Sequence, residues 1–216
     1  MDSFDISIKR FDEFAAEYTE RFNDIDSYLI SVNRFCDLIT GSKPKILELA
    51  CGPGNVTRYI RHRFPESEYI AIDLAPKMID IARQQVKGVD FRIMDVRAIS
   101  SFDTKYDAIM CSFCLPFLSV FDACKLIADC AERLNENGII YISTMEGNES
   151  KAGFESTSFT GDSKVFFNYH ELQVLEKALL ENGFIIDDIR RQNYIEPNGS
   201  ILIDLILIGI KTSNHS

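Results

Sequence analysis

With 216 residues, 46% of them hydrophobic and 26% charged, the chain has the length and composition of one ordinary globular domain. Its formal net charge of −10 disfavours nucleic acid as a partner, because phosphate binding requires clustered Lys and Arg residues. The first residues lack the basic start and apolar run of a secretory signal, and the longest apolar stretch is about half of what a bilayer requires, so we expect a cytoplasmic protein without membrane contact.

The first forty residues are predicted to be helical. Apolar residues recur at helical spacing from Phe11 to Phe22 and again from Ile25 to Ile39. We therefore expect two helices ahead of the core, in a segment of residues 1–42 that forms a lid over one end of the sheet.

From Lys45 onward, short apolar runs alternate with segments of helical periodicity. Strands are predicted at 46–49, 69–72, 89–94, 106–111 and 139–143, and helices at 56–64, 78–86 and 120–134. Repeated strand–helix–strand units imply a parallel sheet that is covered by helices on both faces.

The last third of the domain is predicted to begin with a long connection. Residues 146–162 are rich in Gly, Ser, Thr and Glu and lack the periodicity of an element. A helix at 170–180 and strands at 184–189 and 201–210 follow. The turn with Pro197-Asn198-Gly199 is too short for a helical crossover, so the final strand must be antiparallel. The predicted fold is therefore α/β: a doubly wound, mostly parallel seven-stranded sheet with an antiparallel last strand.

A turn with two glycines follows the first strand of this sheet. Gly52 and Gly54 permit a tight turn and close approach of a ligand to the backbone. Asp73 ends the second strand 19 residues beyond Gly54, where a carboxylate can accept hydrogen bonds from both hydroxyls of a ribose. The turn and the acid together indicate an adenosine-like ligand.

Two ligands compete for this turn, a dinucleotide and S-adenosylmethionine. In the dinucleotide fingerprint the third glycine would stand at Thr57, and Pro53 removes a backbone donor from a turn that would hold a pyrophosphate. Glu48 would repel a pyrophosphate, whereas it suits a ligand with an ammonium group and a sulfonium centre. The residues favour S-adenosylmethionine, and an NAD(P)-dependent oxidoreductase is the alternative enzyme.

The region resembles the class I S-adenosylmethionine-dependent methyltransferases, whose first motif, acid-x-x-x-Gly-x-Gly, is matched by Glu48, Gly52 and Gly54. The resemblance covers Lys45 to Lys211 in the order of elements. It implies methyl transfer from S-adenosylmethionine to a small-molecule acceptor, with a non-catalytic S-adenosylmethionine-binding module as a further alternative. It also implies that residues 43–145 bind the cofactor and that residues 146–216 supply the acceptor loop and an antiparallel hairpin.

The resemblance further implies which residues hold the cofactor. The first turn would contact the methionine part, Asp73 the ribose, and residues just beyond the second and third strands the adenine, while the end of the fourth strand would face the sulfonium. The full expected set is Tyr18, Glu48, Ala50, Cys51, Gly52, Pro53, Gly54, Asn55, Asp73, Leu74, Met78, Asp95, Val96, Cys111, Ser112 and Phe113.

A general base is optional for displacement from a sulfonium, because alignment in a dry site supplies much of the acceleration. Tyr169 and His170, after the long connection, are the candidates for such a base, and a solvated or capping role is the alternative for the histidine. No His and carboxylate residues have metal-ligand spacing, and Cys111 and Cys114 lack a second pair. We therefore expect no metal. The sequence identifies neither the acceptor nor the oligomeric state.

Overall fold

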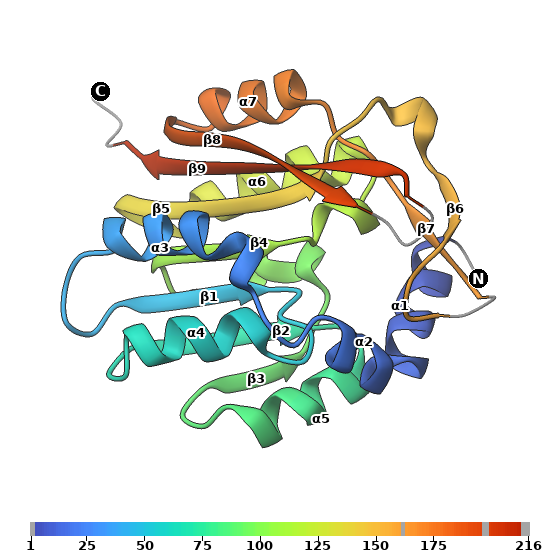
Figure 1. Cartoon of the computed structure of the whole chain (residues 1–216). Coiled ribbons are helices and arrows are strands. Elements are labelled where there is room, and N and C mark those ends of the chain that lie inside the picture. Colours follow the sequence, from blue (N-terminus) through green and yellow to red (C-terminus); the bar gives the residue numbers. More distant parts are fainter. Residues whose placement is uncertain (1–2, 161–162, 196–198, 213–216) are drawn as a thin grey trace.

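The structure, a computed structural model, describes residues 3–160, 163–195 and 199–212 (Figure 1). Its main sheet has seven strands in the order β3-β2-β1-β4-β5-β9-β8. The strands are β1 (Lys45–Leu49), β2 (Glu68–Asp73), β3 (Asp90–Ile93), β4 (Tyr106–Ser112), β5 (Leu134–Met145), β8 (Phe184–Ile195) and β9 (Ile201–Lys211).

Strands β1 to β5 pair in parallel, whereas β9 pairs antiparallel with both β5 and β8. The predicted α/β fold, with its mostly parallel seven-stranded sheet and antiparallel last strand, is confirmed. Pro197 and Asn198, the predicted turn residues before β9, lie outside the described residues.

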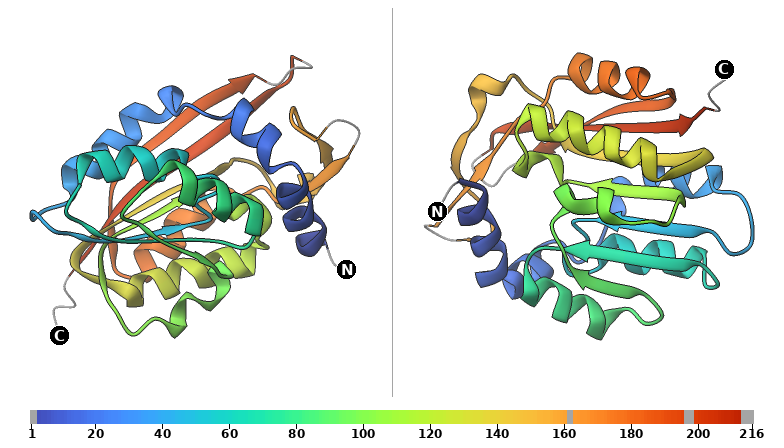
Figure 2. Two further views of the ribbon diagram at one scale, coloured as in Figure 1. Left: turned by 90° about the horizontal axis from the view of Figure 1, so that it is seen from below. Right: turned by 180° about the vertical axis from the view of Figure 1, so that it is seen from behind.

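Helices cover both faces of this sheet (Figure 2). The helices are α3 (Leu29–Leu38), α4 (Asn55–Arg63) and α5 (Pro76–Gln85) on one face, and α6 (Val120–Arg133) and α7 (Leu172–Glu181) on the other. Side chains of one strand alternate between the two cores, as in β4, where Ala108 packs toward α3 and α4 while Ile109 packs toward α6. Short 3-10 turns fill three connections, at Asp26–Tyr28, Val96–Ser101 and Leu115–Phe117.

The N-terminal segment differs from its prediction. The apolar stripe from Phe11 to Phe22 belongs to two helices, α1 (Ser3–Glu13) and α2 (Ala15–Arg21), which are interrupted at Phe14. The apolar spacing continues across this break because apolar residues of both helices line the same cavities, which are described below. No helix in the described ranges is long and apolar enough to span a membrane.

The predicted connection over residues 146–162 was wrong in part. It contains a 3-10 turn (Glu149–Lys151) and the strand β6 (Gly153–Ser156), which pairs antiparallel with β7 (Lys164–Phe167). This small hairpin lies beside α1 at the end of the sheet where the parallel strands finish (Figure 1). The N-terminal helices and the hairpin therefore enclose the open end of the sheet.

Candidate active site

The turn that follows β1 has an unusual backbone. Ala50, Gly52 and Gly54 have φ angles of 52°, 53° and 90°, in the left-handed region. A side chain added at Gly52 would meet only Tyr18 Cε1, at 3.9 Å, so the turn leaves open space beside its backbone. A Cβ at Gly54 would meet Ala82 Cβ at 3.3 Å, so this glycine allows α4 and α5 to pack closely and faces away from the cavities.

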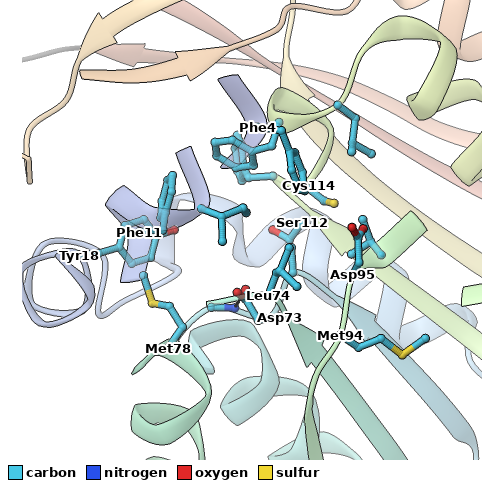
Figure 3. A pocket seen from close by; sticks show the side chains of 17 residues that line it. Phe4, Phe11, Tyr18, Asp73, Leu74, Met78, Met94, Asp95, Ser112 and Cys114 are labelled. Atoms are coloured by element: carbon cyan, nitrogen blue, oxygen red, sulfur yellow. Dashed lines mark hydrogen bonds between the residues drawn. The ribbon is translucent and has the colours of Figure 1, made fainter. Parts of the chain in front are cut away.

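Asp73 ties two turns together. The amide of Gly52 donates to its Oδ2 atom at 2.9 Å, and the amide of Ala75 donates to Oδ1 at 2.8 Å. Burial raises the pKa of Asp73, while these backbone hydrogen bonds act against that rise. The carboxylate is therefore fixed at the end of β2, beside the β1 turn (Figure 3).

A first cavity of about 80 Å³ extends from Asp73 along the ends of β2, β3 and β4. Ten of the residues expected to bind the cofactor line it: Tyr18, Ala50, Gly52, Asp73, Leu74, Met78, Asp95, Val96, Ser112 and Phe113. It is also lined by Phe4, Ile8 and Phe11 of α1, which the sequence analysis did not assign to the site. Their only sequence signal was the apolar face of an N-terminal helix.

Asp95 is held by a neighbouring arginine. Arg97 Nη2 lies 2.6 Å from Asp95 Oδ2, the Arg97 amide donates to Oδ1, and the guanidinium stands 4.0 Å from the Phe4 ring centroid. Burial alone would raise the pKa of Asp95, but Arg97 holds it below the usual range. A ligand at this acid would therefore share it with Arg97.

A second cavity of about 240 Å³ adjoins the first. The two cavities share seven lining residues, Phe11, Tyr18, Ala50, Gly52, Ser112, Phe113 and Phe117. The larger cavity adds four expected residues of the first turn: Glu48, Cys51, Pro53 and Asn55. The β1 turn and the end of β4 therefore form the junction between two spaces.

Two buried acids line the larger cavity. Glu48 is 1% exposed and accepts a hydrogen bond from Tyr69 Oη at 2.6 Å, and burial raises its pKa to about 7 against the effect of that bond. Asp204 is 3% exposed, and burial raises its pKa to about 6 although Tyr28 Oη donates to Oδ2 at 2.7 Å. Both carboxyl groups can change charge near neutral pH.

Asn55 adds a buried acceptor to the same cavity. Its Nδ2 donates to the carbonyl of Phe22, while its Oδ1 atom is buried and has no hydrogen-bond partner in the described part of the chain. A buried amide oxygen without a partner is costly, so a donor from a ligand would be favourable there.

Four predicted positions do not line either cavity: Gly54, described above, and Cys111, Tyr169 and His170. Cys111 is 2% exposed and packs in the core beneath the end of β4. His170 is fully buried, with Nε2 at 2.8 Å from the carbonyl of Leu115, and burial lowers its pKa. Tyr169 is 4% exposed and donates to Glu155 Oε1 at 2.7 Å. Tyr169 and His170 thus lie apart from the cavities, because the chain packs against the Leu115–Phe117 turn before α7 begins.

Tyr28 and Asp204 line the larger cavity but were not expected there. The one signal in the sequence was that Asp204 interrupts the apolar run of the last strand. Within the described ranges, no group of three or more His, Cys, Asp and Glu residues could hold a metal ion, and all six cysteines are free.

The fold is shared with solved structures of methyltransferases. The domain aligns with magnesium protoporphyrin IX methyltransferase of Synechocystis PCC 6803, a structure with bound S-adenosylmethionine, at a TM-score of 0.73 over 98% of each chain with 14% identity. It aligns with an amino pentose methyltransferase of Micromonospora echinaspora at a TM-score of 0.61, over 87% of this chain and 91% of that one, with 16% identity. The fold is that of the class I methyltransferases.

Sequence comparison matches part of the chain to methyltransferases. Residues 46–138 match the model of a methyltransferase domain. Demethylmenaquinone methyltransferase of Thermotoga maritima is 29% identical over 63% of this chain and 60% of its own length, and malonyl-[acyl-carrier protein] O-methyltransferase of Bacillus anthracis is 33% identical over 63% and 51%. Residues 46–138 of the chain thus match a methyltransferase domain, and these relatives and structural neighbours are methyltransferases. The chain spans 34% to 60% of the length of the first curated relatives that it matches.

Proposed function

We propose that this chain is an enzyme that transfers the methyl group of S-adenosylmethionine to a small-molecule acceptor. The observation that carries the proposal is the pair of adjoining cavities, one containing Asp73 and the other containing Glu48, which share the β1 turn. They lie beyond the carboxyl ends of the parallel strands, where open α/β sheets bind ligands.

The residues of the smaller cavity suit the nucleoside half of S-adenosylmethionine. Asp73 keeps lone pairs for ribose hydroxyls while its backbone bonds fix its position. Leu74, Met78 and Val96 supply an apolar surface for adenine. On the other side of the junction, Glu48 and the buried Oδ1 atom of Asn55 suit the ammonium of the methionine half.

Bound S-adenosylmethionine would supply a methyl group activated by a sulfonium centre. Gly52, Ser112 and Phe113, which border both cavities, would hold donor and acceptor in line, and such alignment supplies much of the acceleration. Rings from α1, α2 and the hairpin surround the junction and would exclude water from it.

Each of three segments of the chain has a proposed role. Residues 1–42 would act as a lid, residues 43–145 would bind the cofactor, and residues 146–216 would contribute the acceptor side. Tyr18 would contact both ligands, since it lines both cavities. A cytoplasmic location and the lack of a nucleic-acid partner fit the net charge of −10 and are proposed with it.

The first test is the choice of ligand. Isothermal titration with S-adenosylhomocysteine should show micromolar binding, whereas NADH should give no saturable heat, because Glu48 would oppose a pyrophosphate at the turn. Saturable binding of NADH alone would favour the oxidoreductase. Binding of S-adenosylhomocysteine without turnover in a broad acceptor screen would favour a non-catalytic module.

The second test is Asp73→Asn. The amide oxygen of Asn can still accept one backbone bond, but the loss of the charged acceptor should remove about 1.5–3 kcal/mol of S-adenosylhomocysteine binding, roughly a tenfold to hundredfold loss of affinity. Asp80→Asn, an exposed acid on α5 that pairs with Arg83, is the matched control. Equal affinity of the two variants would show that the ribose does not bind at Asp73.

A further inference from the structure

A polar pair lies in the larger cavity away from the β1 turn. Because β9 is antiparallel, its first half lies at the edge of the sheet where β4 and β5 end: Ser112 stands opposite Ser143, and Met145 stands opposite Asp204. Tyr28, at the start of α3, donates its hydroxyl to Asp204, and its ring contacts Phe113 with centroids 5.3 Å apart. The pair is thus connected to the junction between the two cavities.

The walls around this pair are aromatic. Phe159 contacts Phe11, Tyr18 and Phe22, with ring centroids 5.2, 5.1 and 6.1 Å apart. All four rings line the larger cavity. Such walls suit an apolar or aromatic body, and aromatic faces also attract a cation.

The charges of the larger cavity have one sign. Of the described residues that line it, four are acids, Asp24, Glu48, Glu155 and Asp204, and none is Lys, Arg or His. Glu48, on β1, is assigned above to the ammonium of the cofactor, which leaves Asp24, Glu155 and Asp204 for the acceptor. A carboxylate or phosphate acceptor would meet no cation in this lining, whereas an ammonium would be attracted from several sides.

We infer that the acceptor is an amine carried on an apolar or aromatic body, and that Asp204, positioned by Tyr28, binds the amine nitrogen and takes up the proton that the transfer releases. The inference rests on the proposed methyltransferase function and names its acceptor class. It assigns Asp204 the role that the sequence analysis had considered for Tyr169 and His170.

Every bond, electron pair and proton of the methyl transfer is accounted for when Asp204 takes up the proton. The ammonium of the bound acceptor would give one proton to the Asp204 carboxylate, and the lone pair of the resulting neutral amine would form the bond to the methyl carbon while the carbon–sulfur bond breaks and its electron pair stays on sulfur. The methylated nitrogen would leave as an ammonium, and Asp204 would return its proton to solvent. Burial raises the pKa of Asp204 to about 6, which makes it a stronger base than an exposed aspartate.

An oxygen acceptor fits the lining less well. A hydroxyl becomes a strong nucleophile by losing its proton, and the resulting oxyanion would face Asp204 without any Lys, Arg or His in the described lining to stabilise it. An amine attacks as a neutral group, and its charge after transfer matches the surrounding acids.

The experiment compares three probes of one shape: 2-phenylethylamine, 2-phenylethanol and phenylacetate. Binding of each is measured by ligand-observed NMR titration with the full chain saturated with S-adenosylhomocysteine, and methylation is measured by mass spectrometry with S-adenosylmethionine. The amine should bind about tenfold or more tightly than the other two, as expected for a hydrogen-bonded charge pair. It should also gain one methyl group.

Variants of Asp204 and Tyr28 test whether these two residues cause the preference for the amine. Asp204→Asn should weaken amine binding about tenfold or more and Tyr28→Phe by less, while S-adenosylhomocysteine affinity stays within about twofold. Asp129→Asn, a buried acid on α6 that pairs with Lys125 outside both cavities, should change neither affinity. If Asp204→Asn does not fold, Tyr28→Phe and the probe ranking of the unmodified chain still decide the matter.

The outcomes separate the two proposals. Failure of S-adenosylhomocysteine to bind would overturn the proposed function. If S-adenosylhomocysteine binds, three results would overturn this inference alone. The first is equal or tighter binding of the alcohol or carboxylate, and the second is no amine binding at millimolar concentration. The third is an Asp204→Asn variant that keeps full amine affinity.

Discussion

Glu48 shows how one residue combines a functional position with a cost in stability. Its carboxyl group is buried beside the β1 turn and accepts a hydrogen bond from Tyr69, and burial raises its pKa to about 7. A buried carboxylate without a cation is unfavourable in the folded protein. A bound ammonium would supply the missing positive charge.

Replacing Glu48 by Gln should therefore stabilise the unliganded protein above pH 7. In the unfolded chain Glu48 loses its proton near pH 4.5, whereas in the folded chain Glu48 keeps its proton to about pH 7. The stability that this group contributes is therefore complete below pH 4.5 and is lost as the pH rises to 7. The loss is about 3–4 kcal/mol, because one pKa unit corresponds to about 1.4 kcal/mol. Glutamine keeps an acceptor for Tyr69 and has no charge to bury.

The measurement is urea denaturation of both proteins at pH 5 and pH 8. The difference in unfolding free energy between Glu48→Gln and the unmodified chain should be larger at pH 8 than at pH 5. Glu68→Gln, an exposed acid on β2, is the control and should show no such change. An identical difference at the two pH values would mean that Glu48 titrates normally.

Site residues differ in how far the sequence could reveal them. Glu48, Gly52 and Asp73 were accessible because their chemistry depends on a local turn and on a fixed distance along the chain. Asp204 and Tyr28 are 176 positions apart, and only the antiparallel course of β9 brings them together. The burial of His170 could not be predicted from the sequence either, because it depends on contact with Leu115, a residue 55 positions away.

At the scale of elements, one serine joins α1 to the hairpin. Ser7 is 1% exposed; its hydroxyl accepts from the Phe166 amide at 3.0 Å and lies 3.2 Å from the Phe166 carbonyl and 3.0 Å from the Ser3 carbonyl. The hydroxyl has one proton, so it donates to one of these carbonyls at a time. The Ser7 side chain thus provides hydrogen bonds between α1 and β7.

Ser7→Ala should loosen this junction without unfolding the domain. The Phe166 amide would lose its acceptor, at a local cost of about 1–3 kcal/mol, and its hydrogen exchange should accelerate about tenfold or more. Thr19→Ala, which removes a hydroxyl bonded only within α2, is the control and should leave Phe166 unchanged. Unaltered exchange at Phe166 would show that the serine does not hold the two elements together.

The hairpin also marks where element prediction failed. The strands of the main sheet were predictable because burial on both faces gives them continuous apolar runs. β6 has four residues with alternating half-buried and exposed side chains, in a segment rich in polar residues, so nothing in the sequence separates it from a loop. Its partner β7 packs against α1, a contact between distant parts of the chain.

At the scale of the whole molecule, the sheet and the elements that enclose it have different kinds of support. The sheet is packed on both faces by two large apolar cores, whereas α1 and α2 pack on a small cluster that includes Ala15, Ala75 and Met78. The alternation of strands and helices therefore predicted the mostly parallel sheet, and the short turn before β9 predicted its antiparallel last strand. How the N-terminal segment lies over that edge depends on a few aromatic contacts between distant parts of the chain.

Ligand binding should accordingly protect one end of the molecule. Phe11 of α1 and Tyr18 of α2 line both cavities, so opening of the N-terminal segment would remove part of the site. At a S-adenosylhomocysteine concentration 100 times its Kd, amides that exchange only through this opening should exchange up to about 100-fold more slowly. Hydrogen exchange with mass spectrometry should show the slowing in α1, α2 and the hairpin but not in peptides of α7, whose residues line neither cavity. Slowing confined to the β1 turn, with α1 and α2 unchanged, would mean that the ligand binds and leaves without movement of the N-terminal segment, and would remove its role as a lid.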